Sequence, residues 1–553
     1  MSAYNLATAL HEMAASKPDA LAIALPKAKG KPLPAEGPIP YREITFKELS
    51  EQTHALARGL IASGFQQGDR VVLMVPPSLE FFTLSFAFMQ AGIVPVLIDP
   101  GIGFKHLKAC IGEAEPVGFI GISKAHAARV LLGWGSATIK KKVTIGPRLF
   151  WGGAPFRRLQ KAGRQEAPAI DFEIKTDDIS AILFTSGSTG VPKGVMYTYG
   201  NMWHQVQVIR QTFKLQFGEV DLPTFPPFAL FNPTSGIASI IPDMDPTRPA
   251  EVDPERIIRV IEQYGITNMF GSPALLDRVG RYGEAHQIKL PTLKRVISAG
   301  APVPAKTLRR FSGMLQPETP IFTPYGATET MPLACISSHE LLTETVQQRT
   351  DSGGGICIGK PVDSLTLRII GISDLPIESW SDDLEVGVGE IGEIVVKGKH
   401  VTRAYFNRSE ATQLAKIPDG DSFWHRMGDL GYIDTAGNIW FCGRKAHRVQ
   451  LPDKELYSVQ CEFIFNKHPK VHRTALVGVG QEPVLCVEID QEAEAPDLEQ
   501  IRKELLAWAA GNDLTKDILQ VLFHPSFPVD IRHNAKIFRE KLAPWAAQKI
   551  KGV

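Results

Sequence analysis

The chain has 553 residues, of which 44% are hydrophobic and 22% are charged. This composition is typical of a globular protein and excludes a disordered or fibrous chain. Lysine plus arginine number 60 and aspartate plus glutamate 59. The resulting net charge of +1 gives no sign of a nucleic-acid partner or of binding to anionic membranes.

The six cysteines form no CxxC pair, and they are too few for a disulfide scaffold in a chain of this length. We therefore expect reduced, mostly buried thiols in a cytoplasmic protein. The N-terminus has no basic region leading into an apolar one, so no signal peptide is expected. The most apolar stretch, residues 79–98, contains Glu80, Gly92 and Pro95, and it predicts a buried helix and strand rather than a membrane span.

The first hundred residues alternate between helical and strand patterns. Residues 5–25 predict an amphipathic helix that runs into a short strand at Ala20, and residues 26–40, with five prolines, predict a surface loop. Further elements are expected as helices over 47–63 and 79–91 and strands over 70–75 and 93–98. This alternation predicts βαβ units and a parallel sheet, hence an α/β fold.

The rest of the chain divides into regions with different predicted secondary structure. Residues 123–170 are basic and predict irregular structure, and α/β alternation is expected again over 179–330. After residue 355 we expect a small β-rich subdomain, followed by a separate C-terminal α+β domain. The expected elements are strands over 365–370, 393–397, 438–442, 474–479 and 484–489, an acidic loop over 381–385, and a helix over 498–510.

The sharpest local motif is Leu183-Phe-Thr-Ser-Gly-Ser-Thr-Gly-Val-Pro-Lys-Gly194, in which a β pattern leads into a loop of glycine and hydroxyl residues that ends at Lys193. Glycines let backbone N–H groups point at an anion, and hydroxyls and a lysine add donors and charge. Pro192 before the lysine excludes a Walker A loop. A polar turn is the alternative interpretation of this segment.

Three weaker motifs follow. In Pro324-Tyr-Gly-Ala-Thr-Glu-Thr330, Tyr325 could stack on a base, Thr328 could reach a phosphate, and Glu329 is a hard oxygen ligand suited to Mg²⁺. Asp429, within Arg426-Met-Gly-Asp-Leu-Gly-Tyr432, could hold ribose hydroxyls, and Lys536 precedes a C-terminal helical pattern. Each of these alone is more typical of a solvated turn or of a charged surface.

In this order, the four motifs resemble those of the adenylate-forming superfamily, which comprises acyl-CoA synthetases, luciferases and adenylation domains. The resemblance extends from Leu6 to Lys536. It implies a large N-terminal ATP- and acyl-binding domain over 1–443 and a small mobile domain over 444–553 that carries the adenylation lysine.

The resemblance also implies roles for individual residues. Lys536, Thr328 and Glu329 are expected to be catalytic, with Glu329 holding Mg²⁺. The positions expected to bind ATP are Thr185, Ser186, Gly187, Ser188, Thr189, Gly190, Lys193, Gly300, Ala301, Pro302, Tyr325, Gly326, Asp429 and Arg444.

The chain departs from the thioester-forming pattern of the superfamily at four sites. His447 replaces the usual Asp or Lys of the hinge, and Pro452 stands where a glycine of the pantetheine tunnel is expected. Ala229 replaces a gating histidine or aromatic residue, and Asn534-Ala-Lys536 replaces Ser-Gly-Lys. These departures weaken the case for coenzyme A as the acceptor.

Two segments, Pro242–Pro249 and Arg532–Arg539, resemble the β-lactone synthetases of bacterial long-chain olefin biosynthesis, a branch of the superfamily. That resemblance implies a long-chain 2-alkyl-3-hydroxy acid as substrate, a β-lactone, AMP and pyrophosphate as products, and a complex with other enzymes of the pathway. A long-chain acyl-CoA or acyl-AMP ligase is the alternative within the superfamily. A carrier-loading or nucleotide-sensing module is the alternative from another class.

Two features of the reaction stay open at this point. A general base would assist lactone closure, and His425, His447 and His533 are candidates by residue type alone. Three residues that could line the acyl pocket are equally plausible as core: Phe228, Phe231 and Met244.

Overall fold

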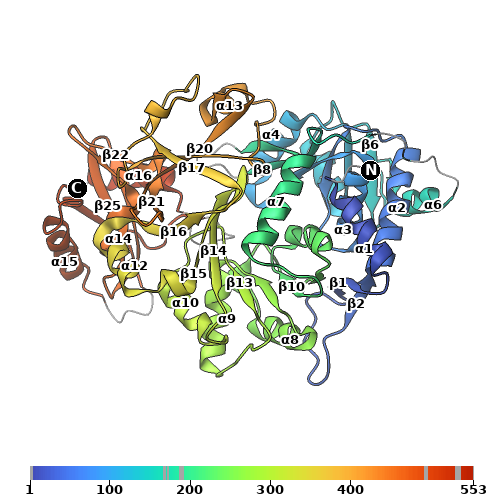
Figure 1. Ribbon diagram of the computed structural model, residues 1–553, viewed down its shortest axis with the longest axis horizontal. Helices are drawn as coiled ribbons and strands as arrows, with labels where there is room; N and C mark the ends of the chain where they lie inside the picture. The colour runs from blue at the N-terminus through green and yellow to red at the C-terminus, as the bar shows by residue number, and fades with distance from the viewer. Residues whose placement is uncertain are drawn as a thin grey trace.

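The computed structural model describes residues 4–165, 170, 173–185, 192–490, 496–529 and 537–551. The chain ends lie at opposite sides of the molecule, with the N-terminal half on the right of Figure 1 and the C-terminal domain on the left. Two large sheets dominate the larger part of the chain. A three-stranded sheet and a two-strand hairpin belong to the C-terminal part.

The first large sheet has the strand order β7-β6-β5-β3-β4-β8-β9. All neighbouring strands are parallel except β8 and β9, which form an antiparallel pair. Its strands are β3 (Arg70–Met74), β4 (Val94–Ile98), β5 (Gly118–Ile122), β6 (Lys141–Ile145), β7 (Ala154–Pro155), β8 (Ile179–Thr185) and β9 (Lys193–Thr198). The helices connecting them or preceding them are α1 (Leu6–Ser16), α2 (Phe46–Ala62), α3 (Leu79–Ala91), α4 (Phe104–Ala114), α5 (Ser123–Leu132) and α6 (Phe156–Arg164), with the short 3-10 helix η1 (Pro100–Ile102).

Helix α3 is buried along almost its whole length because its sequence is apolar on every side. The Ser78 side chain caps its N-terminus and Gly92, in the left-handed conformation, ends it. The helix packs against α1, α2 and β4, which confirms the predicted buried helix and strand over 79–98. Among the described residues, no helix is both long and apolar enough to cross a membrane.

The second large sheet begins with a mainly parallel half in the order β14-β13-β12-β10-β11-β1, to which β2 adds an antiparallel edge. These strands are β1 (Leu21–Pro26), β2 (Tyr41–Thr45), β10 (Val220–Pro223), β11 (Ala238–Ile240), β12 (Asn268–Phe270), β13 (Arg295–Ile297) and β14 (Ile321–Ala327). One face packs on α8 (Pro254–Tyr264), α9 (Pro273–Ala285) and α10 (Ala305–Ser312) in an apolar core. Helix α7 (Tyr199–Thr212) and the 3-10 turns η2 (Pro226–Leu230) and η3 (Asn232–Ser235) lie on the other face, and η4 (Pro249–Glu251) precedes α8.

The same sheet continues as the antiparallel β-rich subdomain that the sequence predicts after residue 355. Its strands are β15 (Thr330–Ser337), β16 (Ile356–Pro361), β17 (Leu365–Ile370), β18 (Gly392–Gly398), β19 (Lys416–Asp419), β20 (Ser422–Ile433) and β21 (Ile439–Arg444). Short helical segments connect them: α11 (Ser338–Leu341), α12 (Glu344–Arg349), η5 (Thr350–Gly354), η6 (Asp382–Leu384) and α13 (Ser409–Ala415).

The C-terminal α+β domain is also as predicted. It contains η7 (Lys445–His447), β22 (Val449–Gln450), β23 (Glu455–Leu456), α14 (Ser458–Asn466), β24 (Val471–Val479), β25 (Glu482–Ile489), α15 (Leu498–Ala510), β26 (Gln520–Phe523) and α16 (Arg539–Lys551). Helix α14 packs on η5 of the larger part, where the Gln460 side chain donates a hydrogen bond to the Gly353 carbonyl at 2.9 Å.

One prediction about the fold was wrong. Over the described residues 123–165 the chain is not irregular, because it contains α5, β6, β7 and α6. Helix α6 buries Phe156 and Leu159 against α2 while its arginines and lysine face outward. The basic composition therefore belongs to the exposed faces of ordinary elements. The prediction of mostly buried thiols is confirmed, since five of the six free cysteines are buried.

Candidate functional site

The Tyr-Gly-Ala-Thr-Glu motif forms a tight hairpin at the end of the parallel strands. Tyr325 and Gly326 are among the last three residues of β14, which ends at Ala327. Thr328 and Glu329 form the two-residue connection, and β15 starts at the next residue. A Cβ atom on Gly326 would lie 2.6 Å from the Thr330 carbonyl oxygen, so the close approach of the two strands requires glycine there. The hairpin is half-buried rather than the solvated turn of the alternative interpretation.

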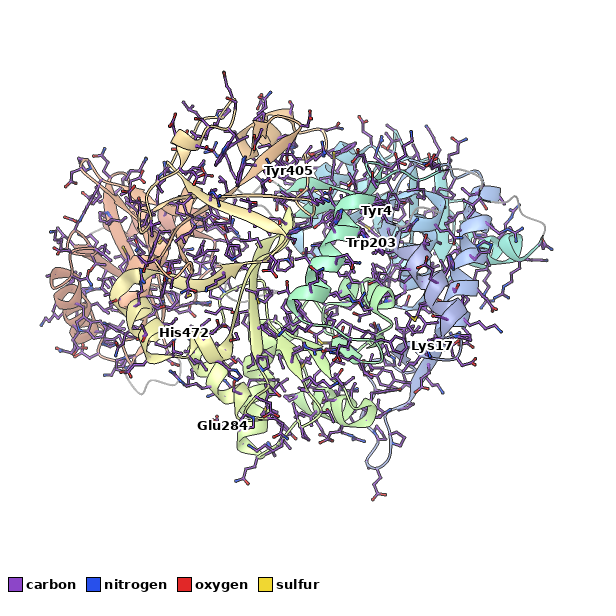
Figure 2. The ribbon with its side chains drawn as sticks, in the orientation of Figure 1. Tyr4, Lys17, Trp203, Glu284, Tyr405 and His472 are labelled. Atoms are coloured by element: carbon purple, nitrogen blue, oxygen red, sulfur yellow. The ribbon has the colours of Figure 1, made fainter. Side chains whose placement is uncertain are left out.

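Neighbouring segments hold this turn at three points. The Tyr405 hydroxyl donates a hydrogen bond to Glu329 Oε1 at 2.6 Å, and the Thr402 N–H donates to the Glu329 carbonyl at 2.9 Å. The Tyr197 hydroxyl, from β9, donates to the Thr328 carbonyl. Figure 2 shows Tyr405 near the upper end of α7. The carboxylate of Glu329 is thereby oriented, and its second oxygen, which receives no hydrogen bond from the described residues, is left for a ligand.

Cationic side chains surround the same turn. Lys193 Nζ lies 5.0 Å from the centre of the Tyr405 ring, and the buried Lys416 donates a hydrogen bond to the Thr402 carbonyl. Burial lowers the pKa of Lys416 to about 7, although the negative charge of Glu329 opposes the shift. The pKa of His425 is held well below its ordinary value by burial and by the charges of Lys416 and Lys193. His425 is therefore neutral at neutral pH.

The predicted phosphate loop is described only at its two ends. Thr185 ends β8, Lys193 begins β9, and the two residues pair across the strands. The other predicted loop positions, Ser186, Gly187, Ser188, Thr189 and Gly190, lie outside the described residues, as does Lys536.

Asp429, which is buried, forms one group with the partly exposed Arg444 and Tyr325. Arg444 Nη1 lies 3.0 Å from Asp429 Oδ1, and the Tyr325 hydroxyl donates to Asp429 Oδ2. Burial raises the pKa of Asp429, and the Arg444 charge opposes that rise. Burial and the neighbouring Asp429 raise the pKa of Tyr325 well above its ordinary value. This arrangement places a carboxylate and an aromatic ring together, a combination suited to a ribose and its base.

Gly300, Ala301 and Pro302 follow β13, the strand that pairs with β14. Gly300 is exposed and has a φ of 98°. Because β13 and β14 are parallel neighbours, their carboxyl ends place this loop beside Tyr325.

A narrow apolar cavity of about 80 Å³ lies between α7 and the face of the sheet that carries β10, β12, β13 and β14. Phe228 and Phe231 line it, whereas Met244 packs against the core beneath the other face. The remaining lining residues are Val206, Ile209, Arg210, Phe213, Leu215, Asp221, Asn232, Ser235, Ile237, Asn268, Phe270, Ile297, Ala299, Pro324, Met331 and Pro332. The two phenylalanines therefore fit an acyl pocket, and Met244 does not.

The positions that depart from the thioester-forming pattern are scattered. Ala229 is buried in the core around α3, outside the described cavity lining, and Pro452 is exposed in the turn between β22 and β23. His447 ends η7, and Asn534 lies outside the described residues. In segment 242–249, the Asp243 carboxylate accepts a hydrogen bond from the Gly30 N–H at 3.0 Å and forms an ion pair with Arg256. It therefore fixes the position of the 26–40 loop.

Within the described residues there is no cluster of three or more metal-ligating side chains. Mg²⁺ does not need one, because it is usually bound by one or two carboxylates together with substrate phosphates. Beside Glu329, the hydroxyl groups of Thr330 and Thr402 are buried without a hydrogen-bond partner among the described residues. A carboxylate whose second oxygen receives no hydrogen bond from the described residues fits a hydrated Mg²⁺.

Reasoning from the sequence missed three residues of this site: Tyr197, Tyr405 and Lys416. The two tyrosines reach the motif from strands and loops distant in sequence, so no local pattern identifies them. Lys416 begins the short strand β19, Lys-Ile-Pro-Asp, in which no alternation of apolar and polar residues marks the lysine as buried.

Residues 10–406 match the AMP-binding enzyme family. The chain is 46% identical to the olefin beta-lactone synthetase of Xanthomonas campestris pv. campestris, covering 99% of this chain and 98% of that protein. It is 45% identical to the olefin beta-lactone synthetase of Stenotrophomonas maltophilia, with the same coverage. In fold it is similar to the o-succinylbenzoate coenzyme A synthetase of Bacillus subtilis, solved in complex with ATP and magnesium ion. The TM-score is 0.73 at 20% identity, over 97% of this chain and 98% of that structure.

Proposed function

The chain belongs to the AMP-binding enzyme family, and we propose that it converts 2-alkyl-3-hydroxy acids and ATP into β-lactones, AMP and pyrophosphate. The observation that carries this proposal is the 46% identity to an olefin beta-lactone synthetase over 99% of the chain. The enzyme is an AMP-forming ligase with the adenylate-forming fold.

Adenylation requires a substrate carboxylate to attack the α-phosphate of ATP against like-charge repulsion. Lys193 and the donors of the loop before it would offset the charge of the triphosphate. Asp429 and Arg444 would hold the ribose, with Tyr325 against the base. Thr328 would donate to the α-phosphate from the same turn that orients Glu329.

Glu329 would hold Mg²⁺, with Tyr405 fixing the orientation of its carboxylate. When bound, Mg²⁺ neutralises charge on the triphosphate and stabilises the leaving pyrophosphate. Residues 1–443 are proposed to bind ATP and the acyl group, and residues 444–553 to move as a unit that brings Lys536 to the reacting oxygens.

The acyl adenylate is an activated anhydride, and its own β-hydroxyl is the acceptor. Holding that hydroxyl next to the carbonyl makes the attack intramolecular, for which effective molarities reach about 10⁵ M. The cavity under α7 would hold the hydrocarbon chains through Phe228 and Phe231. Because no coenzyme A is needed as acceptor, the exposed Pro452, in place of a glycine of the pantetheine tunnel, would not impair catalysis.

The test is product analysis by mass spectrometry after incubation with ATP, Mg²⁺ and a long-chain 2-alkyl-3-hydroxy acid, with and without coenzyme A. A β-lactone in both samples supports the proposal. A thioester that forms only with coenzyme A identifies an acyl-CoA ligase instead. A complex with other enzymes of olefin biosynthesis and a cytoplasmic location stay predictions.

A further inference from the structure

Asp221 is the one carboxyl group among the described residues that line the acyl cavity, and the reaction proposed above does not use it. Asp221 is on β10, where its side chain shares a face of the sheet with Asn268 and lines the cavity with it. Leu222, the next residue, points to the opposite face and packs in the core beneath it. The carboxyl group of Asp221 therefore faces the space that would hold the substrate.

The hydrogen bonds of Asp221 leave one oxygen available. Asn232 Nδ2 donates to Asp221 Oδ2 at 2.9 Å, and the same amide nitrogen lies 2.8 Å from Ser239 Oγ. Among the described residues, Asp221 Oδ1 has no hydrogen-bond partner. Asn232 thus fixes the orientation of the carboxyl group while Oδ1 remains for a ligand.

The electrostatic surroundings make this carboxyl group a proton acceptor near neutral pH. Burial raises the pKa of Asp221 to about 7, with a further rise from Glu219, opposed by the Asn232 hydrogen bond and by Arg295. Glu219 is itself paired with Arg295 at 2.6 Å and lies 3.7 Å from Lys294. Arg210 is the other charged residue of the described cavity lining, and its side chain is exposed.

The cavity also reaches the adenylation site. Pro324 and Ala299 line it, and each directly precedes a predicted ATP-binding residue, Tyr325 and Gly300. Met331 lines it from the other arm of the hairpin that carries Glu329. A substrate carboxyl group at that hairpin would extend its β-carbon and its alkyl chains into the cavity.

We infer that Asp221 is the general base of the lactone-closing step, an inference that rests on the proposed function. Asp221 Oδ1 accepts the proton of the β-hydroxyl as that oxygen forms a bond to the carbonyl carbon of the acyl adenylate. The bond from the carbonyl carbon to the phosphate oxygen breaks, and AMP leaves with the electron pair. A base with a pKa near the working pH is the most effective one for such a proton transfer.

His425, one of the three histidine candidates, is less suited to this step. It is not among the described residues that line the cavity, and its Nδ1 lies 3.0 Å from the Ala415 carbonyl oxygen. A proton gained there would be placed beside the charges of Lys416 and Lys193.

The test compares the two half-reactions in Asp221→Asn and in wild type. We expect ATP–pyrophosphate exchange with the hydroxy acid to stay within a few-fold, whereas lactone formation falls at least about 100-fold and bound acyl-AMP accumulates. Asp221→Ser carries the same expectation if the asparagine variant is unstable. Glu219→Gln is the control. It removes a buried carboxylate two residues away and should lower Tm while leaving the ratio of lactone formation to exchange within a few-fold.

In single turnover, wild-type lactone formation should rise with pH to a plateau with a midpoint near 7, and the Asp221→Asn profile should be flat through that range. Exchange and lactone formation that fall in parallel would assign Asp221 a structural role and overturn the inference. An unchanged lactone rate in Asp221→Asn would also overturn it. The proposed function fails separately, if wild type itself makes no lactone.

Discussion

Glu329 lies in a two-residue connection between two strands, and three hydrogen bonds from distant segments fix the position of that connection. We predict that Glu329→Gln lowers ATP–pyrophosphate exchange at least about 100-fold at low Mg²⁺, because the neutral amide removes the charge that holds the cation. Exchange measured across a Mg²⁺ titration should recover in part at high Mg²⁺. Wild-type exchange at low Mg²⁺ would remove Glu329 from this role.

Tyr405→Phe tests the orientation of that carboxylate rather than its charge. The variant loses one hydrogen bond of 2.6 Å to a charged acceptor, a bond worth about 1.5–3 kcal/mol. We therefore expect ATP–pyrophosphate exchange to decrease roughly 10-fold or more, and the Mg²⁺ concentration needed for exchange to increase. An unaltered Mg²⁺ dependence would show that the hydroxyl does not position Glu329.

Lys416 makes the stability of the protein dependent on pH. Its pKa is about 7 in the folded protein and near 10.5 when unfolded, so between these values the unfolded state binds the extra proton. Stability contributed by this group therefore rises from pH 7 to about pH 10 and is constant below pH 7. In Lys416→Met this rise should be absent. Urea denaturation of wild type and of Lys416→Met at pH 7, 8 and 9 measures the free energy of unfolding. The same pH dependence in both proteins would refute the lowered pKa of Lys416.

At the scale of elements, the segment that joins β21 to the C-terminal domain is closely packed. Gly443 has a φ of 136°, and a Cβ there would lie 2.6 Å from Ser458 Oγ at the start of α14. We predict that Gly443→Ala lowers Tm by more than Gly437→Ala, which has a φ of 81° and open space around it. Adding Ser458→Ala should restore part of the loss. Equal Tm values for the two single variants would contradict the packing argument.

The elements themselves were largely predictable from the sequence, for physical reasons visible in each. Helix α3 and strand β17 have the apolar periodicity and the glycine or turn boundaries that define such elements locally. The region 123–170 was misjudged because lysines and arginines obscure the few buried positions of β6 and α6. Amphipathic elements of that kind are recognisable only from the surfaces they pack against.

At the scale of the whole molecule, the functional site is assembled from segments hundreds of residues apart. The Tyr325–Glu329 motif and Asp429 have a recognisable local pattern, because Gly326 and Gly431 lie close to neighbouring backbone and Gly428 has a positive φ. Tyr405, Lys416 and Asp221 follow no local pattern. They were not predictable, because their roles depend on which loops and strands tertiary packing places around the turn and the cavity.

The proposed mobile domain over 444–553 predicts a specific effect for the lysine that it carries. Lys536→Ala should abolish acyl-adenylate formation while ATP affinity changes within a few-fold, because a contact made mainly in the transition state lowers turnover rather than binding. Calorimetric ATP titration and exchange assays on the same preparation measure both. ATP affinity lost in parallel with activity would contradict the prediction.

The central claim is that the β-hydroxyl of the substrate, rather than coenzyme A, accepts the activated acyl group. The most direct measurement supplies ATP, Mg²⁺ and a long-chain 2-alkyl-3-hydroxy acid, or the same acid without its hydroxyl, and identifies the products with and without coenzyme A. The hydroxy acid should give a β-lactone, AMP and pyrophosphate at a rate independent of coenzyme A. The acid without the hydroxyl should stop at bound acyl-AMP or hydrolyse slowly. A coenzyme A thioester formed from that acid as fast as the hydroxy acid gives any product would contradict the account.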